Sequence, residues 1–382
     1  MIEEMNIIEE VKLFAEKEIR PYASNFETTE ALPRALIVKM AEKGFLSAPF
    51  PKEYGGMGLN PIIYGLLTEE IGKACCSTRA LLTVHTSLVG ETILSRGSDE
   101  QKKFWLPLMA SGDKIGAFAL TEPDVGTDAK SVKTNYVRVG DTFVINGNKK
   151  WITFGGIADF FIVIASNNDE ITAFIVDRNL EGVQTKRING LIGSRAAFVA
   201  EVEFKDVHVS ENCILGQIGN GYSYIVNSAL DFGRHSIAWA GLAIAQESLD
   251  SMVSYARQRK QFGKAIYTYQ LIQGIIGDAV TNIHAARSLC LSASKMRMEK
   301  HEDSIIETSI AKYFTSKIAN KIASDAVQVH GGNGCSNNYP VERLFREAKI
   351  LEIIEGTSQI QQEIISKFGL RRYFKSNYKY IL

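Results

Sequence analysis

The spacing of hydrophobic residues changes twice along the chain. Up to about residue 116, apolar side chains recur every three or four positions, as in 7-IIEEVKLFAEKEI-19 and 32-LPRALIVKMAEKGF-45, which predicts amphipathic helices. From about residue 117 to residue 225 the apolar runs are short and several alternate, and 136-YVRVGDTFVING-147 predicts a β-hairpin. This second segment is therefore interpreted as a β domain of roughly 100 residues.

After residue 227 the helical period returns over longer stretches. Residues 229–259, 269–300 and 307–332 each carry one apolar face, and three long helices with short connections predict a helical bundle. We therefore expect an α+β protein with three domains. They are an N-terminal α-helical domain at 1–117, a middle β domain at 118–226 and a C-terminal α-helical domain of four-helix type at 227–382.

The composition narrows the class of protein. The chain has 382 residues, and Lys plus Arg equal Asp plus Glu at 43 each, so no excess of charge favours a nucleic acid or a membrane surface as partner. No apolar run approaches the ~20 residues of a membrane span, and the acidic, periodic first 21 residues resemble neither a signal peptide nor a transit peptide. Five scattered cysteines without CxxC spacing favour a soluble protein of the reducing cytoplasm.

Common metal and nucleotide motifs are absent from the sequence. The six histidines form no HExxH pattern and no Cys/His cluster, so we expect no metal. Neither GxxxxGK[ST] nor GxGxxG after a strand occurs, which argues against a Rossmann site.

Three loops admit both a structural and a functional interpretation. In 118-FALTEPDVGTDAKSVKT-134 a turn is followed by exposed backbone amides and a hydroxyl group. Such a loop can bind a polar ring edge or a phosphate, and it is equally compatible with an ordinary connection between two elements. In 148-NKKWITFGG-156 the indole of Trp151 suits one face of an aromatic ligand as well as a domain junction. The glycines of 330-HGGNGC-335 suit close approach to a ligand, although a helix C-cap followed by a loop is the simpler interpretation.

A helix start is predicted in 351-LEIIEGTSQIQ-361. Thr357 or Ser358 can cap a helix that begins at Gln359, and Ser358 with Gln361 fits a capping box. If residues 345–351 are helical, Glu352 lies near the end of that helix and faces solvent or an ionic partner.

Glu355 stands between two isoleucines and a glycine in the same stretch. A carboxylate that precedes a helix N-terminus is stabilised by the helix dipole. Desolvation by Ile353 and Ile354 acts in the opposite direction, because it raises the pKa of the carboxyl and suits a general base. The composition alone does not choose between these two interpretations.

Six segments, in one order, carry a resemblance to a known family. They are FPKEYGG (50–56), LTEPDVGTD (120–128), WIT (151–153), RKQFGK (259–264), QVHGGNG (328–334) and IIEGTSQIQ (353–361). Together they resemble the acyl-CoA dehydrogenase family over nearly the whole chain. The family fold is an α domain, a β domain and a second α domain, which agrees with the periodicity above.

The resemblance implies FAD, held without a Rossmann motif. The loop from Phe118 to Thr127 and the strand at Trp151 are implied to hold the flavin, with Thr153 beside its N5 atom. Arg259 and the turn from Gln328 to Gly332 are implied to reach the FAD of a neighbouring subunit. The residues implied to bind the cofactor are Phe118, Leu120, Thr121, Gly126, Thr127, Trp151, Ile152, Thr153, Arg259, Gln261, Phe262, Tyr269, Gln270, Gln328, Val329, Gly331, Gly332, Thr357, Ser358 and Gln359.

The catalytic base of the family corresponds to Glu355. The resemblance implies that its carboxylate removes the α-proton of an acyl thioester while the β-hydride passes to flavin N5. The Glu355 N–H and the flavin ribityl chain are implied to polarise the thioester carbonyl. Some subfamilies carry the base near 231-DFGR-234, where this chain has Gly233, which cannot act. The residues implied to contact the substrate are Thr127, Asp231, Arg234 and Gly356.

Two positions depart from the family pattern. Gln261 stands where Thr is common, and Tyr269 stands where His is usual before Gln270. Both lie at the expected rim of the cofactor site, so these departures affect the expected contacts with FAD and not the expected reaction.

Four local segments resemble a narrower group of enzymes. They are 76-CSTRALLTVH-85, 193-GSRAAFVAEVEF-204, 231-DFGRHSIAWAG-241 and 349-KILEIIEGTS-358, which are similar to dehydrogenases of polyketide and peptide antibiotic pathways that act on acyl groups tethered to acyl carrier protein. We therefore expect a carrier-protein-tethered substrate in secondary metabolism. The alternative is an ordinary short- or medium-chain acyl-CoA dehydrogenase of fatty-acid or amino-acid catabolism.

The family also implies partners. They are further copies of the chain, in a homotetramer or at least a dimer, and an electron-transfer flavoprotein as electron acceptor. Two other functional classes stay open: a flavin oxidase or monooxygenase that passes electrons to oxygen, and a non-catalytic flavin-binding scaffold. The presence of Glu355 argues against the scaffold and against most monooxygenases.

Overall fold

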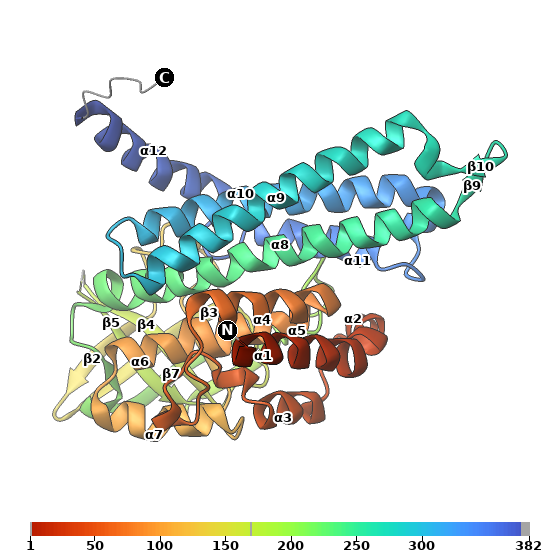
Figure 1. Ribbon diagram of the computed structural model, residues 1–382. Helices are drawn as coiled ribbons and strands as arrows, with labels where there is room; N and C mark the ends of the chain where they lie inside the picture. Colours follow the sequence, from red (N-terminus) through yellow and green to blue (C-terminus); the bar gives the residue numbers. More distant parts are fainter. Residues whose placement is uncertain (1, 169, 376–382) are drawn as a thin grey trace. The chain divides into compact units, whose positions relative to one another are not determined.

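The computed structural model describes residues 2–168 and 170–375 and divides the chain into two compact units, Met1–Gly233 and Arg234–Leu382. The first unit contains the N-terminal helices and the β-sheet (Figure 1). These share one hydrophobic core, whose members run from Val11 to Ala229. The order helical, β, helical is confirmed, whereas the domain boundaries expected near residues 117 and 226 stay predictions.

Two of the N-terminal helices begin at side-chain caps that the sequence supplies. Asn60 accepts the backbone N–H groups of Ile62 and Ile63 at 3.0 and 3.1 Å, and Pro61 occupies the first position of α4, which its fixed φ suits. Ser98 and Gln101 form a capping box at the start of α7. The helices are α1 (Ile2–Phe14), η1 (Ala15–Ile19), η2 (Arg20–Tyr22), α2 (Ala23–Thr29), α3 (Arg34–Glu42), η3 (Phe45–Ser47), η4 (Lys52–Tyr54), α4 (Pro61–Ala74), α5 (Cys76–Leu81), η5 (Leu82–Gly90), α6 (Glu91–Arg96) and α7 (Asp99–Ala110).

The π-helix η5 links this helical layer to the sheet. All nine of its residues are buried, including His85, whose Nε2 lies 3.1 Å from the Met109 carbonyl oxygen and whose Nδ1 accepts the N–H of Gly116 at 3.2 Å. Burial lowers the pKa of His85 to about 4, so the ring is neutral. His85 is thus a packed histidine.

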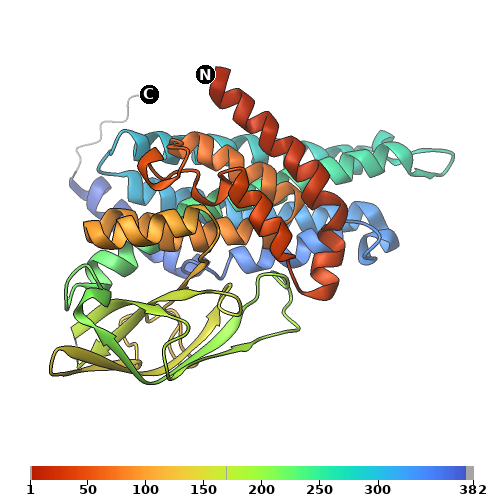
Figure 2. The ribbon, with the colours of Figure 1, turned by 90° about the horizontal axis from the view of Figure 1, so that it is seen from below.

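The strands of the first unit form one mixed, eight-stranded sheet in the order β6-β7-β3-β2-β4-β5-β8, with β1 paired to β4. The predicted hairpin is confirmed, because β2 and β3 pair antiparallel with Val139 opposite Thr142. The N-terminal helices lie on one side of this sheet (Figure 2), where Trp105 packs on Phe160. The elements are β1 (Gly116–Ala119), β2 (Asn135–Val139), β3 (Thr142–Ile152), β4 (Phe160–Asn167), β5 (Glu170–Asp177), β6 (Val183–Arg187), β7 (Ala200–Ser210), η6 (Glu211–Cys213), β8 (Ile214–Leu215) and η7 (Gly221–Val226).

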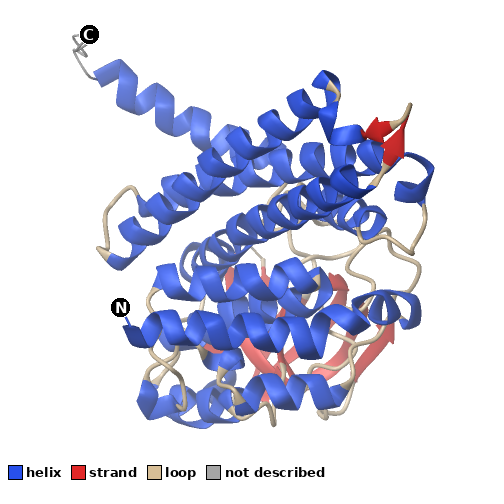
Figure 3. Ribbon diagram, turned by 45° about the vertical axis from the view of Figure 1, so that its right-hand side comes forward, coloured by secondary structure: helices blue, strands red, loops and turns tan. Residues whose placement is uncertain are grey.

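Over its described residues, 234–375, the second unit is helical apart from one small hairpin (Figure 3). Its α10 packs against α9, α11 and α12. Gly241 of α8 lets that helix cross α10 closely, since an added Cβ would lie 2.7 Å from backbone of Thr315. Among the described residues, no helix is long and apolar enough to span a membrane. The elements are α8 (Asn227–Gln258), which starts in the first unit, β9 (Lys260–Gln261), β10 (Lys264–Ala265), η8 (Ile266–Thr268), α9 (Gln270–Met298), α10 (Ser304–His330), η9 (Gly331–Cys335), α11 (Val341–Leu351) and α12 (Ser358–Lys375).

Candidate active site

The loop between α11 and α12 holds Glu355 in an unusual backbone conformation. Glu355 has a φ of 55° and Gly356 a φ of 89°. The left-handed region is uncommon for glutamate and accessible to glycine. A non-glycine residue stays there only when its surroundings determine the conformation, and such residues cluster at functional sites.

The start of α12 differs from the predicted one. The helix begins at Ser358 rather than at Gln359, and Thr357 caps it by accepting the N–H of Ile360 at 3.3 Å. The predicted capping box is wrong, because Ser358 donates its N–H to the Glu352 carbonyl at 2.9 Å and the Gln361 amide donates to the loop instead. Gln359 is exposed on the first turn.

Three side chains from three helices hold the carbonyl oxygens of Glu355 and Gly356. Arg234 of α8 donates its Nε–H to the Glu355 oxygen at 3.1 Å. Gln361 of α12 donates to both oxygens at 3.2 Å. Lys312 of α10 donates from Nζ to the Gly356 oxygen at 2.8 Å. We call Arg234, Lys312 and Gln361 the carbonyl clamp.

Lys312 brings a buried positive charge to this loop. Its side chain is 0% exposed. Burial lowers the pKa of Lys312 to about 8, an effect that the charge of Glu355 opposes and that of Arg234 reinforces. The ammonium group therefore remains charged at neutral pH.

The two glutamates of the loop have different surroundings. Glu355 Oε2 is shielded from solvent, whereas Glu352 ends α11 and pairs with Lys349 at 3.0 Å, which confirms the ionic partner predicted for it. Ile353 is 53% exposed and Ile354 is partly buried. The shielding of Glu355 by Ile353 and Ile354 stays a prediction, although more than half of the Ile353 side chain is exposed within the chain.

Asp231, another expected substrate contact, is partly buried and lies one turn before Arg234 in α8. Gly233, between them, is buried.

The loop after β1 contains the predicted turn. Glu122 and Val125 exchange backbone hydrogen bonds at 2.9 and 3.3 Å. The Thr121 carbonyl accepts the N–H of Lys150 at 2.8 Å, which ties the loop to β3. Of the five expected cofactor residues between Phe118 and Thr127, Thr121 is partly buried, two are buried and two are exposed. The buried pair is Phe118 and Leu120, and the exposed pair is Gly126 and Thr127.

A buried ion pair fastens this loop. Lys149 Nζ donates to Glu122 Oε1 at 2.8 Å and to the Leu120 carbonyl at 3.0 Å. Glu122 also accepts the backbone N–H groups of Lys133 and Thr134 at 2.7 and 2.9 Å. Buried contacts within the first unit therefore determine the path of this loop.

Trp151 is presented by an irregularity in β3. The register with β7 shifts between Lys149 and Ile152, and Trp151 has a φ of 63°. Its indole is 50% exposed, whereas Ile152 is buried and Thr153 starts the next turn. Bulges of this kind re-aim side chains and are frequent beside active sites.

A second group of predicted residues lies around the β9–β10 hairpin. Phe262, at its tip, is 95% exposed with a φ of 50°. The Tyr269 hydroxyl donates to the Gln261 carbonyl at 2.9 Å and so braces the hairpin against the start of α9. Arg259 and Gln270 flank the hairpin and are exposed.

The glycine turn after α10 lies at the same end of the unit as the hairpin. His330 stacks on Tyr255 at 4.2 Å between ring centres, and Asn333 donates to the Tyr255 hydroxyl at 2.9 Å. The C-cap interpretation is confirmed, because Gly331 caps α10 with a φ of 60°. Of the expected cofactor residues, Gln328 and Val329 lie in the last turn of α10, and Gly331 and Gly332 lie in η9 directly after it.

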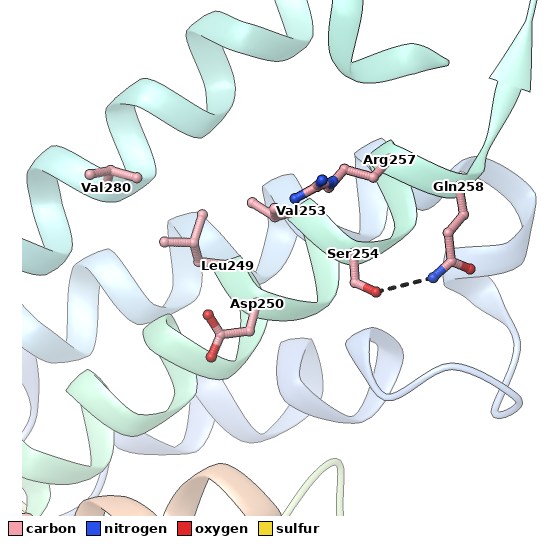
Figure 4. A pocket seen from close by; sticks show the side chains of 7 residues that line it. All are labelled: Leu249, Asp250, Val253, Ser254, Arg257, Gln258 and Val280. Atoms are coloured by element: carbon pink, nitrogen blue, oxygen red, sulfur yellow. Dashed lines mark hydrogen bonds between the residues drawn. The ribbon is translucent and has the colours of Figure 1, made fainter. Parts of the chain in front are cut away.

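The structure does not bring these two groups to Glu355 within the chain. The eleven residues of α11 separate the glycine turn from the Glu355 loop, a length of about 16 Å at 1.5 Å per residue. An open groove of about 540 Å³ lies along α8 and α9 (Figure 4). Its lining residues are Leu249, Asp250, Val253, Ser254, Arg257, Gln258 and Val280, and none belongs to the Glu355 loop.

Comparison with known proteins gives the same domain order. The sequence matches the acyl-CoA dehydrogenase N-terminal domain over residues 2–113, the middle domain over 117–207 and the C-terminal domain over 219–370. The chain belongs to the acyl-CoA dehydrogenase family. It is 40% identical to an acyl-CoA dehydrogenase of Bacillus subtilis, over 94% of this chain and 96% of the relative.

Two solved structures share the acyl-CoA dehydrogenase fold over nearly their full length. Butyryl-CoA dehydrogenase from Megasphaera elsdenii has a TM-score of 0.93 and 33% identity, covering 96% of this chain and 98% of its own. The prolyl acyl carrier protein oxidase AnaB has a TM-score of 0.91 and 28% identity, with the same coverage of 96% and 98%.

As a member of the acyl-CoA dehydrogenase family, the chain is an FAD-dependent oxidoreductase acting on acyl thioesters. The residues present fit this cofactor. The half-exposed indole of Trp151 offers a flat apolar face, and Gly126 and Thr127 offer exposed backbone and a hydroxyl in the same unit. Among the described residues, no cluster of three metal-binding side chains occurs.

Four residues organise these segments in roles that were not predicted from the sequence. They are Lys312 and Gln361 in the carbonyl clamp, and Glu122 and Lys149 in the buried ion pair. One signal was available: Lys312 lies in 309-SIAKYFTS-316, at a position on the buried face of a helix, where a lysine needs a partner.

Proposed function

We propose that the chain catalyses α,β-dehydrogenation of an acyl thioester with Glu355 as the base. The proposal is supported above all by the carbonyl clamp, which supplies three donors to hold the Glu355–Gly356 turn. A base must stay within hydrogen-bond reach of the α-carbon, and a fixed turn supplies that constraint.

The chain contributes three actions to this reaction. The Glu355 carboxylate takes the α-proton. The Glu355 backbone N–H polarises the thioester oxygen, which stabilises the developing enolate. Trp151 and the loop from Phe118 to Thr127 hold the cofactor. When bound, the flavin accepts the hydride from the β-carbon.

Anaerobic titration tests this function. The purified, FAD-loaded protein is mixed with short acyl thioesters without oxygen, and the flavin absorbance is followed. Bleaching with formation of the α,β-unsaturated thioester supports the proposal. A flavin that stays oxidised with every acyl thioester supports the scaffold alternative, and rapid reoxidation by air after bleaching supports an oxidase.

The second part of the proposal concerns the carrier of the acyl group. We infer a carrier-protein-tethered substrate in secondary metabolism, supported by the likeness of residues 76–85 and 231–241 to carrier-protein enzymes and by the similarity to AnaB, a prolyl acyl carrier protein oxidase. The higher identity to an acyl-CoA dehydrogenase of B. subtilis and the similarity to butyryl-CoA dehydrogenase favour the alternative, a short-chain CoA thioester.

One comparison separates these two carriers. The same short acyl group is presented on CoA and on an acyl carrier protein, and kcat/KM is measured for both. A preference of at least ~10-fold for the carrier protein, about 1.4 kcal/mol, supports the inference. Equal or faster turnover of the CoA thioester contradicts it and leaves the dehydrogenase function intact.

We further propose that the active protein is a homotetramer or a dimer. The apolar side chains of Phe262 and Leu271 are 95% and 85% exposed near one end of the second unit, where burial against a second copy of the chain would remove them from water. The nearby groove carries Asp250 and Arg257, so a second copy across a twofold axis presents complementary charges. The electron acceptor is proposed to be an electron-transfer flavoprotein, tested by the rate at which it reoxidises the reduced enzyme.

A further inference from the structure

Lys312 lies in the middle of α10 with its whole side chain buried. An ammonium group in such a place is costly unless it is partnered. Its nearest recorded partner is the backbone carbonyl of Gly356, at 2.8 Å, the residue directly after the proposed base. Of the clamp residues, Lys312 alone is both charged and fully buried. Arg234 is partly exposed, and Gln361, also 0% exposed, is uncharged.

We propose that Lys312 is a positioning residue for the base: its ammonium group anchors the Gly356 carbonyl, keeps Glu355 in its left-handed conformation and holds a positive charge beside the loop. This inference rests on the proposed function of Glu355. It goes beyond that function, because it gives a buried residue of α10 the role of fixing the conformation of the base and favouring its ionised form.

The geometry explains why an anchor is needed. Both Glu355 and Gly356 have positive φ, and a left-handed glutamate reverts to a commoner conformation when its neighbours do not hold it. The Gly356 carbonyl is held by Lys312 and Gln361, and the Glu355 carbonyl by Arg234 and Gln361. Removing Lys312 leaves the Gly356 carbonyl with its longer bond only.

The charge of Lys312 has a second effect, on the ionisation of Glu355. The charged groups that act on Lys312 are Glu355 in the loop, Glu352 at the end of α11 and Arg234 on α8. The attraction between Lys312 and Glu355 is mutual, so the ammonium group favours the ionised carboxylate that accepts the proton. Loss of this charge shifts the balance toward the protonated carboxyl.

Lys312→Met is the test, with Lys317→Met as the matched control on an exposed face of the same helix. Methionine fills the buried space without a charge or a donor. We expect the rate of flavin reduction to fall roughly 10- to 100-fold, with little change in KM and FAD content. The acid limb of the kcat profile should move to higher pH, and Lys317→Met should behave as wild type.

Lys312→Gln provides a second variant that keeps a hydrogen-bond donor without the charge. It should show the shifted pH profile with a smaller fall in rate, and it tests the proposal if the methionine variant does not fold. A lysine that merely fills space would change only the melting temperature, so an unchanged rate and pH profile in either folded variant overturns the inference.

Glu355→Gln, measured in parallel, separates this inference from the function on which it rests. If Glu355→Gln still reduces its flavin, the base is elsewhere and the proposed function fails. If Glu355→Gln is inactive while the Lys312 variants keep wild-type rate and pH profile, only the positioning role fails.

Discussion

Lys149 Nζ lies 2.8 Å from Glu122 Oε1, and the two side chains are 0% and 3% exposed. Burial lowers the pKa of Lys149 to about 8. Burial alone would raise the pKa of Glu122, but the charge and hydrogen bond of Lys149, with the N–H groups of Lys133 and Thr134, hold it below its ordinary value. Both groups are therefore ionised at neutral pH, and the pair fastens the loop expected to hold the flavin.

Lys149→Met should destabilise the protein, because it leaves the Glu122 carboxylate buried without its cation. Breaking a buried pair costs about 3–5 kcal/mol, and the FAD content of the purified protein should fall as the loop loosens. Urea unfolding and the flavin-to-protein absorbance ratio measure the two effects.

Lys133→Met is the control for this prediction. Lys133 pairs with Asp124 in the same loop, but the side chains are 68% and 74% exposed, and such surface pairs contribute about 0–1 kcal/mol. Equal losses of stability in Lys149→Met and Lys133→Met would contradict the structural role of the buried pair.

Trp151→Gly and Trp151→Ala should separate the contribution of the indole to FAD binding from the strain of the backbone at residue 151. Both variants remove the flat face, so both should bind FAD more weakly, by about 1–2 kcal/mol or more for a lost aromatic contact. Glycine accepts the φ of 63°, so Trp151→Gly should unfold at a higher temperature than Trp151→Ala. FAD affinity by fluorescence titration and thermal melting give the answers, and unchanged affinity in both variants would show that Trp151 does not cover the cofactor.

Glu355→Gln should abolish turnover while FAD and fold remain. Glutamine is nearly isosteric but cannot accept a proton, and loss of a general base costs about 100- to 10,000-fold. Glu352→Gln, three residues earlier, removes a charge that pairs with Lys349 but leaves the Glu355 carboxylate in place, so it should stay near the wild-type rate. Anaerobic stopped-flow bleaching measures both, and an inactive Glu352→Gln beside an active Glu355→Gln would reverse the assignment.

Stability should rise with pH between about 8 and 10. The pKa values of Lys149 and Lys312 are about 8 in the folded chain, against 10.5 ordinarily, so in this window the unfolded chain binds more protons and the unfolding free energy increases with pH. Below pH 8 both states are protonated and these two lysines add no slope. Above pH 10 the pKa of Tyr64, raised by burial, acts in the opposite direction.

Lys312→Met removes one of these two contributions. Its gain in unfolding free energy from pH 8 to pH 9.5 should be smaller than that of wild type by about 2 kcal/mol, at ~1.4 kcal/mol per pKa unit. Urea unfolding at pH 7.5, 8.5 and 9.5 measures the slope. A parallel slope in wild type and Lys312→Met would mean that burial does not lower the pKa of Lys312, because the folded and unfolded chains would then hold this proton equally across the window.

Leu271→Glu should dissociate the oligomer. Leu271 is 85% exposed at the start of α9, and a glutamate there replaces a gain of about 1.5–3 kcal/mol for a buried leucine with a desolvation cost in each copy. Leu370→Glu, at a 72% exposed leucine of α12, is the control. Light scattering should show a smaller mass for Leu271→Glu alone, and a wild-type chain that is already monomeric would refute the proposal.

The sequence by itself determined the order of the elements and the family. Hydrophobic period is a local property, so the strands, the β2–β3 hairpin and the long helices α8, α9 and α10 lie close to where the spacing predicts them. The segment around Glu355 and the turn at Glu122 were recognisable because glycine, proline and capping residues act over a few positions. Even so, local signals misplaced the cap of α12, since Ser358 and Gln361 bond to the loop before it.

Only the tertiary structure decided how the candidate base is held. Arg234, Lys312 and Gln361 are as much as 127 positions apart, and their convergence on two carbonyl oxygens depends on how α8, α10 and α12 pack. The same holds for Lys149 and Glu122, which lie 27 positions apart. A lysine within an apolar stretch of sequence can be either solvated or buried, and only the packing of the fold decides which. Burial and long-range pairing depend on the whole fold, and a periodicity along the chain does not contain them.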